Sequence, residues 1–200
     1  MTKSTIHQLV GNTDIYLLDQ ILKGRYSTSD RILDAGAGGG RNLHWFVQNG
    51  NPVYGVDQNA EAVALLKQHY PSVPKGHFLE AGLENLPFDP DFFDHIICCA
   101  VLHFANDPEH FNAMFAELIR VLKPGGTVFI RVATDVGVAE KMQFLGQGRF
   151  HMPDGTDRFL LTRPMLDRCI KTHQLLLLEP FKAVNVDNQR CMAAIVLQKG

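Results

Sequence analysis

The glycine-rich segment 36–40 limits the fold of this chain more than any other feature of the sequence. Four of its five residues are glycine, and only Ala35 separates it from a short run, residues 31–34, that ends in Asp34. Glycine permits tight turns and lets a ligand approach the backbone closely. The run 31–34 is predicted to be a buried strand and residues 41–48 a helix. A strand, a glycine turn and a helix in this order form the first unit of an α/β fold.

Strands and helices alternate along most of the remaining sequence. Apolar spacing predicts helices over 14–22, 59–70 and 108–122, and apolar runs predict strands over 52–57, 77–80, 93–100 and 127–132. Such alternation produces a parallel sheet with helices on both faces. Two later runs, 175–184 and 191–198, have no helix between them and predict an antiparallel hairpin at a sheet edge. We therefore expect a doubly wound, seven-stranded, mostly parallel α/β sheet with a C-terminal antiparallel hairpin.

The chain has the length of one ordinary domain. Its 200 residues are 46% hydrophobic, which is enough for a buried core, and no repeat or linker divides them. We expect a single domain over residues 1–200, with a helical cap over residues 1–30. Residues 134–162 are long, irregular and rich in glycine, charged and aromatic side chains, so we expect an insertion on the substrate side.

Charge and composition disfavour several kinds of partner. The 19 basic and 21 acidic residues are nearly balanced and the basic ones are scattered, so neither nucleic acid nor an anionic membrane is expected. Residues 1–10 lack the apolar core of a signal peptide, and no stretch approaches the roughly 18 apolar residues of a membrane span. Cys98, Cys99, Cys169 and Cys191 fit neither disulfide nor zinc spacing, and the nine histidines form no ligand pattern. We expect reduced thiols, a cytoplasmic location and no metal site.

The spacing of the glycines separates two kinds of ligand. A dinucleotide fingerprint, G-x-G-x-x-G, would have its third glycine where this chain has Arg41, which disfavours a nicotinamide dehydrogenase. The chain instead reads G-x-G-x-G after Asp34, and a carboxylate there suits a zwitterionic amino acid with an ammonium group. Asp57 ends the second predicted strand, where α/β folds use an acidic side chain to accept hydrogen bonds from ribose hydroxyls. Alone, Asp57 is equally well explained as a helix cap; the glycine loop beside it favours the ligand role.

Successive motifs of the chain resemble those of class I S-adenosylmethionine-dependent methyltransferases. They are Ile32-Leu-Asp-Ala-Gly-Ala-Gly-Gly-Gly40, Val56-Asp57, Leu86-Pro-Phe88 with Phe93-Asp94, Val101-Leu-His103 and Leu122-Lys-Pro-Gly-Gly126. The continuation Gly40-Arg-Asn42 and the short chain are similar to small tellurite-resistance-type methyltransferases. The resemblance implies a Rossmann-like fold, S-adenosylmethionine as the cofactor and S-adenosylhomocysteine as its product.

The resemblance also implies a set of cofactor-binding residues. The backbone of residues 35–38 would hold the methionine part and Asp57 the ribose. Gln58 would flank the adenine, and Cys99 and Ala100 would border the sulfonium. The full set is Asp34, Ala35, Gly36, Ala37, Gly38, Arg41, Asp57, Gln58, Gly82, Leu83, Cys99 and Ala100.

One position departs from the pattern of the family. The family often has an acidic residue about five positions before the proline of its Leu-Pro-Phe motif, where it receives the adenine amino group, and this chain has Gly82 there. Either backbone atoms of Gly82 and Leu83 or the carboxylate of Glu84 would then take that role.

Five polar side chains are candidates for the acceptor side of the site. By resemblance, His103 lies at the mouth of the methyl-donor pocket, where it orients a substrate, acts as a base or only lines the pocket. Arg149 and His151 lie in the insertion, in a cluster with Asp154, Asp157 and Arg158. This cluster either contacts a polar or anionic substrate or consists of solvated loop charges. Tyr16 either covers the cofactor cleft or packs in the core. Arg131 ends the fifth predicted strand, where it either faces a ligand or forms a salt bridge.

We expect the chain to transfer a methyl group from S-adenosylmethionine to a small-molecule acceptor. Two alternatives share the same cofactor site. One is methylation of a protein or tRNA with a partner subunit, and the other is a non-catalytic protein that binds S-adenosylmethionine for regulation. Turnover separates them, because only the enzymes release S-adenosylhomocysteine when an acceptor is offered.

Overall fold

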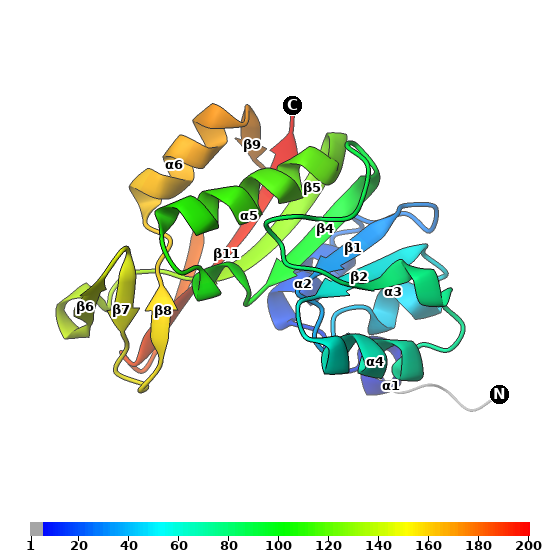
Figure 1. Ribbon diagram of the computed structural model, residues 1–200, viewed down its shortest axis with the longest axis horizontal. Helices are drawn as coiled ribbons and strands as arrows, with labels where there is room; N and C mark the ends of the chain where they lie inside the picture. Colours follow the sequence, from blue (N-terminus) through cyan, green and yellow to red (C-terminus); the bar gives the residue numbers. More distant parts are fainter. Residues whose placement is uncertain (1–5) are drawn as a thin grey trace.

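The computed structural model describes residues 6–200, and its largest element is a twisted sheet between two layers of helices (Figure 1). The helices are α1 (Ile6–Val10), α2 (Ile15–Leu22), α3 (His44–Asn49), α4 (Ala60–His69), α5 (Pro108–Val121) and α6 (Arg163–Thr172). The strands of the main sheet are β1 (Ile32–Ala35), β2 (Val53–Asp57), β3 (Phe78–Glu80), β4 (Phe93–Cys99), β5 (Leu122–Ala133), β9 (Leu175–Leu177), β10 (Lys182–Val186) and β11 (Arg190–Lys199). Short 3₁₀ turns are η1 (Lys75–His77), η2 (Leu102–Phe104) and η3 (Ala139–Lys141).

The main sheet runs in the order β10-β11-β5-β4-β1-β2-β3, and β9 also pairs with β11. Strands β1 to β5 are parallel, whereas β11 is antiparallel to β5, β9 and β10. This confirms the expected mostly parallel sheet with a C-terminal antiparallel hairpin. The first apolar run of that hairpin is split in two, because Pro180 has no N–H to donate to a neighbouring strand.

Different helices cover the two faces of the sheet, as in a doubly wound fold. Ile32 of β1 packs in one core with side chains of α2, α3 and α4, and its neighbour Leu33 packs in the other core with side chains of α5 and α6. Successive side chains of a strand point to opposite faces, so an apolar pair such as this one needs cover on both. Figure 1 shows α5 crossing in front of the central strands.

The insertion 134–162 contains regular secondary structure, so the expectation of an irregular segment was wrong. It contains a separate three-stranded antiparallel sheet, made of β6 (Gln143–Gly146), β7 (Arg149–His151) and β8 (Asp157–Phe159), which stands beside the main sheet in Figure 1. These strands are too short to show a period, and glycines with positive φ separate them. Met152 and Leu160 anchor the small sheet in a buried cluster with Cys191 of β11.

Two helices escaped prediction. Helix α1 has no buried residue, and α6 buries only Leu166 and Cys169, so neither shows an apolar face of ordinary width. The helix expected over 14–22 is confirmed as α2, whose cap is Asp14. Residues 1–5 lie outside the described part of the chain. The first residues of the helical cap expected over 1–30 therefore lie outside it, as does half of the segment 1–10, which lacks the apolar core of a signal peptide. Within residues 6–200, no helix has the length and apolar character to cross a membrane.

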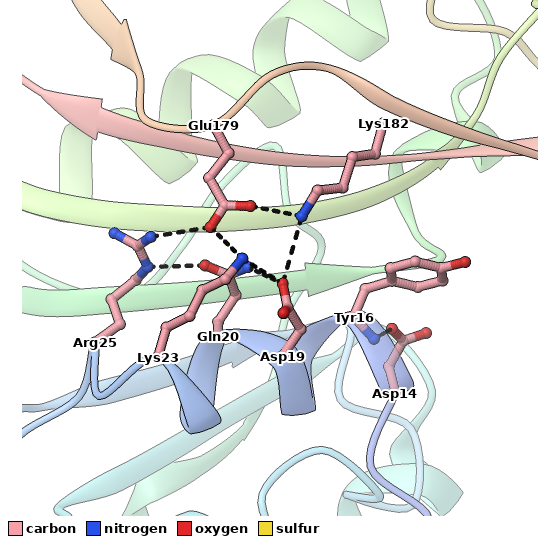
Figure 2. Close-up of polar contacts among 8 residues, drawn as sticks. All are labelled: Asp14, Tyr16, Asp19, Gln20, Lys23, Arg25, Glu179 and Lys182. Carbon is pink, nitrogen blue, oxygen red and sulfur yellow. Dashed lines mark hydrogen bonds and ion pairs between the residues drawn. The ribbon is translucent and has the colours of Figure 1, made fainter.

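A network of charges fixes α2 against the C-terminal strands (Figure 2). The carboxylate of Glu179, between β9 and β10, lies 2.8 Å from Nζ of Lys23, 3.3 Å from Nη2 of Arg25 and 2.7 Å from Nζ of Lys182. Asp19 of α2 also contacts Lys23, at 2.6 Å. Asp14 is the N-cap of α2 and lines a cavity described below. By fixing α2, this network also helps to position Asp14.

Candidate functional site

The glycine segment lies where the strand order of the main sheet reverses. From β1 the chain continues to β2 and β3, and then it returns to β4 on the other side of β1. Ligands of open α/β sheets bind at the carboxyl ends of the strands at such a switch point. The loops after β1 and β4 touch there, since a Cβ on Gly36 would overlap the side chain of Val101. Gly36 also has a φ of 78°, so both space and conformation require glycine.

Two cavities meet at this switch point. The larger has a volume of about 730 Å³ and is lined in part by Ala37, Gly38, Arg41 and Cys99. The smaller has a volume of about 200 Å³ and is lined in part by Asp57, Gln58, Gly82 and Leu83. Both are also lined by Gly36 and Ala100. The structure thus brings together ten of the twelve residues predicted to bind the cofactor, and it leaves Asp34 and Ala35 buried on β1.

Asp57 connects the end of β2 to the glycine loop. Its Oδ2 accepts a hydrogen bond of 2.8 Å from the backbone N–H of Gly38, and its Oδ1 accepts one of 2.9 Å from the N–H of Asn59. Asn59, and not Asp57, caps α4, because its side chain accepts from the N–H groups of the first turn. A carboxylate has about four acceptor positions, so Asp57 keeps capacity for ligand hydroxyl groups.

Asp34 is a buried carboxylate without a partner. Its side chain is 1% exposed, and neither oxygen accepts a hydrogen bond from the described residues. The adjacent N–H groups of Gly36 and Ala37 donate instead to the carbonyl of Val56. Burial raises the pKa of Asp34 to about 7, although the charge of Arg41 acts to lower it. An unpaired buried carboxylate under a glycine loop fits a ligand with a positive charge.

Glu84 lies over the position where the family pattern has an acidic residue. A Cβ on Gly82 would overlap the carboxylate of Glu84, and Glu84 lines the smaller cavity beside Asp57 and Gln58. His110 lies 3.6 Å from the same carboxylate. The Glu84 carboxylate therefore occupies the space that an acidic side chain at position 82 would fill.

A third cavity shares Arg41, Cys99 and Ala100 with the larger cavity and Ala100 and Phe104 with the smaller one. Its volume is about 350 Å³, and its lining includes Arg131 and His103, two of the side chains predicted for the acceptor side of the site. We call it the acceptor cavity. Sequence reasoning missed Arg190 and Asp14 in its lining, because their side chains reach it from the C-terminal hairpin and from the cap of α2. Nothing in the local sequence marks either residue.

Ala100 has an unusual backbone conformation at the junction of the three cavities. Its φ is 65°, in the left-handed region, and its N–H donates a 2.8 Å hydrogen bond to the carbonyl of Arg131. A left-handed alanine costs about 1–3 kcal/mol, and such strain is concentrated at ligand sites. This residue turns the chain sharply away from β4 and leaves the junction open.

The remaining candidates lie at different distances from the acceptor cavity. Tyr16 does not line it, but the Tyr16 ring lies 4.4 Å below the guanidinium of Arg131. Arg149 and His151 line none of the three cavities. His151 is half exposed and pairs with Asp157 across β7 and β8 at 2.7 Å, which agrees with the solvated-charge interpretation. Their neighbour on β8, Arg158, points to the cavity instead, since it is part of the lining.

His103 is held as a neutral imidazole. Burial, together with the charge of Arg158, lowers its pKa to about 4. Its Nδ1 accepts a 3.4 Å hydrogen bond from the N–H of Ala133, so the ring proton belongs on Nε2. In this tautomer the ring carries a donor at Nε2, and removal of a proton from a substrate would need the other tautomer.

Within the described residues there is no group of three or more side chains able to hold a metal ion. The four cysteines are buried free thiols. Among them, Cys99 lies closest to the site, with its sulfur 3.2 Å from Nη2 of Arg41.

Comparisons with known proteins agree with this geometry. The model of a family described as "Methyltransferase domain" matches residues 33–130. An uncharacterised methyltransferase of Synechocystis is 31% identical over 100 residues, which are 50% of this chain and 45% of that protein. The match thus spans less than half of the length of this curated relative.

Solved structures share the fold over almost the whole chain. A S-adenosylmethionine-dependent methyltransferase from Methanosarcina mazei superposes with a TM-score of 0.71 at 22% identity, covering 90% of this chain and 96% of that one. A Burkholderia thailandensis 1,6-didemethyltoxoflavin-N1-methyltransferase, solved with that compound and S-adenosylhomocysteine bound, gives a TM-score of 0.68 at 19% identity and covers 95% and 79%. The family match contains the glycine loop and Asp57, whereas Arg131, Arg158 and Arg190 of the acceptor cavity lie outside it.

Proposed function

We propose that this chain is a class I S-adenosylmethionine-dependent methyltransferase and that it transfers a methyl group from S-adenosylmethionine to a small-molecule acceptor. The match of residues 33–130 to a methyltransferase domain and the fold shared with solved methyltransferases support the proposal. The observation that carries the proposal is the meeting of three cavities at Ala100, where the carboxyl ends of β1 and β4 adjoin. Two of these cavities have the lining expected for the cofactor, and the third is free for an acceptor.

The residues around the first two cavities fit S-adenosylmethionine. We assign the backbone of residues 35–38 and the carboxylate of Asp34 to the methionine part, since Asp34 lacks any other partner and the ligand has an ammonium group. We assign Asp57 to the ribose and Gln58 to the adenine. Glu84, the carboxylate that lies over Gly82, is our candidate for the adenine amino group.

The protein itself has little covalent chemistry to perform in such a reaction. S-adenosylmethionine supplies a methyl group that is already activated by the positive sulfur. The chain has to hold the acceptor in line with that group and to exclude water, which lowers a barrier by roughly 7 to 11 kcal/mol at best. An acceptor that is a thiolate, another anion or a neutral amine needs no base. We therefore assign His103 to orienting the acceptor through Nε2–H and not to proton removal.

The size and charge of the surface support a small acceptor. The acceptor cavity has a volume of about 350 Å³, and basic residues form no tract that would bind nucleic acid. The four free thiols support a reducing compartment, and we propose the cytoplasm.

Calorimetric titration with S-adenosylmethionine and S-adenosylhomocysteine tests the cofactor, and release of S-adenosylhomocysteine tests turnover. We expect micromolar binding and release that depends on a small acceptor. Binding without turnover on any acceptor would favour a regulatory protein, and turnover only with a protein or tRNA would favour a macromolecular acceptor. No binding to the folded chain would refute the proposal.

A further inference from the structure

We propose that the acceptor carries an oxyanion, either a carboxylate or a phosphate, and that arginines of the acceptor cavity bind this group. The inference rests on the proposed methyl transfer and adds the chemical class of its substrate.

The acceptor cavity has an excess of positive charge. Its lining contains four guanidinium groups but only two carboxylates, and His103 is neutral there. These charged residues are Arg41, Arg131, Arg158 and Arg190 with Asp14 and Asp154. The chain as a whole has a net charge of −2, so the excess is local to this cavity.

The two carboxylates cannot satisfy all four arginines. Asp14 is shared, because its Oδ2 lies 3.5 Å from Nε of Arg131 and 3.8 Å from Nη2 of Arg41. Asp154 lies 3.9 Å from Nη1 of Arg190, at the limit of an ion pair. These long separations leave guanidinium donors available to a further anion.

Arg158 forms no ion pair with any described residue. Its Nη1 donates a 2.8 Å hydrogen bond to the carbonyl of Asp157, and its guanidinium lies 4.8 Å from the ring centroid of Phe104. This arrangement holds the side chain beside the cavity and leaves its charge without a counterion among residues 6–200. An oxyanion would supply it.

Arg131 is a partly buried member of the group. Its side chain is 12% exposed and its Nε makes no hydrogen bond. Stacking on Tyr16 and a 3.3 Å hydrogen bond from Nη1 to the carbonyl of Met192 fix its position. A fixed, partly buried cation whose only nearby carboxylate among the described residues is shared with Arg41 favours an anionic ligand over a neutral one.

Apolar side chains complete the cavity wall and limit the size of the ligand. Phe104, Met152 and Met192 line the same space of about 350 Å³. A small molecule with an apolar body and one anionic group matches this combination.

The test compares benzoate, phenyl phosphate and benzamide, which share a ring and differ in charge. Each is titrated into the protein saturated with S-adenosylhomocysteine, followed by NMR chemical shifts because fragments of about nine heavy atoms bind in the millimolar range. We expect at least one anion to bind about tenfold more tightly than benzamide. Benzoate alone would identify a carboxylate site, and phenyl phosphate alone a phosphate site.

Two variants assign the effect to the cavity. Arg158→Gln should reduce the preference for the anion about tenfold, and Arg158→Lys should retain part of it. Arg163→Gln is the matched control, since Arg163 also lies over a phenylalanine ring but lines none of the three cavities. Equal binding of benzamide and both anions, or no binding of either anion, overturns the inference while S-adenosylhomocysteine still binds. Failure of S-adenosylhomocysteine to bind refutes the proposed function itself, and the inference falls with it.

Discussion

At the scale of single residues, Asp57 has a double role in the proposed cofactor site. It accepts a hydrogen bond from Gly38 and so holds the glycine loop, and it keeps acceptor positions for ribose hydroxyls. The substitution Asp57→Ala should weaken S-adenosylmethionine binding by about 1.5–3 kcal/mol, as measured by calorimetry. Asp89→Ala, which removes an exposed carboxylate outside the three cavities, is the control and should leave the affinity unchanged. An unchanged affinity for folded Asp57→Ala would remove the ribose assignment.

Asp34 should make cofactor binding depend on pH. Its pKa of about 7 lies above the ordinary value, so the free protein is more stable below about pH 4 and loses that contribution as the pH rises toward 7. The free protein favours protonated Asp34, whereas an ammonium group of a bound ligand would favour the ionised carboxylate, because the two charges pair. The affinity for S-adenosylmethionine should therefore rise about tenfold between about pH 5.5 and pH 7.5, a range in which an α-amino group stays mostly protonated.

The control for this pH dependence is Asp34→Asn, which keeps the shape of the side chain but cannot ionise. Its affinity should be low and nearly constant over the same range. Parallel pH profiles for the original chain and the Asn variant would show that another group titrates and that Asp34 does not meet the ammonium.

At the scale of structural elements, substitutions in the glycine loop after β1 can distinguish effects on stability from effects on cofactor binding. A Cβ on Gly36 overlaps Val101, whereas a Cβ on Gly38 would meet no atom within 4 Å, and both residues have positive φ. Gly38→Val should therefore cost only about 1–2 kcal/mol of backbone strain but abolish cofactor binding. Gly36→Ala should cost about 1–3 kcal/mol more, from overpacking.

Urea unfolding and calorimetry measure the two effects. Gly24→Ala is the control, since Gly24 also has positive φ and open space but lies outside the three cavities. It should show the strain and retain binding. Normal binding by folded Gly38→Val would mean that no ligand approaches this part of the loop.

The contact between α2 and the C-terminal strands depends on Glu179. Burial acts to raise the pKa of Glu179, but hydrogen bonds from Lys182, Lys23 and Gln20 outweigh it and lower the pKa to about 2. Because this folded-state pKa is depressed, the contribution to stability is present above about pH 4.5 and is lost as the pH falls toward 2. Glu179→Gln should lower the free energy of unfolding by about 1–3 kcal/mol at pH 7.

The exposed pair Arg163 and Asp167 provides the control for Glu179. Its side chains are 52% and 57% exposed, so Asp167→Asn should change stability by less than about 0.5 kcal/mol. The difference between the two variants should shrink as the pH is lowered in thermal denaturation. Equal stability at pH 7 would contradict a structural role for the network.

The elements that could be predicted are those with a strong period or distinctive turns. The glycine loop, the parallel strands and α5 were recognisable because apolar runs and caps mark them, as Asp107 does for α5. Helix α6 and the β6–β7–β8 sheet were not, because few of their residues are buried. The two cavities proposed for the cofactor are lined mainly by loops close in sequence to those strands. The acceptor cavity combines Asp14, Arg158 and Arg190, whose proximity is set only by tertiary packing.

At the scale of the whole molecule, the site draws on nearly the full length of the chain. The acceptor cavity alone is lined by residues from the cap of α2, the loop after β4, the small antiparallel sheet and the first residues of β11, which begins at Arg190. The proposed methyl transfer requires a site that can exclude water, and these distant segments together line one cavity. The family model matches residues 33–130. Residues outside that range therefore supply much of the wall that an acceptor would contact.

Ligand binding at such a site should stabilise the whole domain. A ligand that binds only the folded state adds about 2.7 kcal/mol at a concentration 100 times its Kd. In a domain of 150–250 residues, each kcal/mol raises the midpoint of thermal unfolding by about 2–4 °C, so S-adenosylhomocysteine should raise it by about 5–10 °C. NAD⁺ at the same concentration should leave it unchanged, because Arg41 stands where a dinucleotide site needs its third glycine. A shift with NAD⁺ and none with S-adenosylhomocysteine would assign the switch point to a dinucleotide.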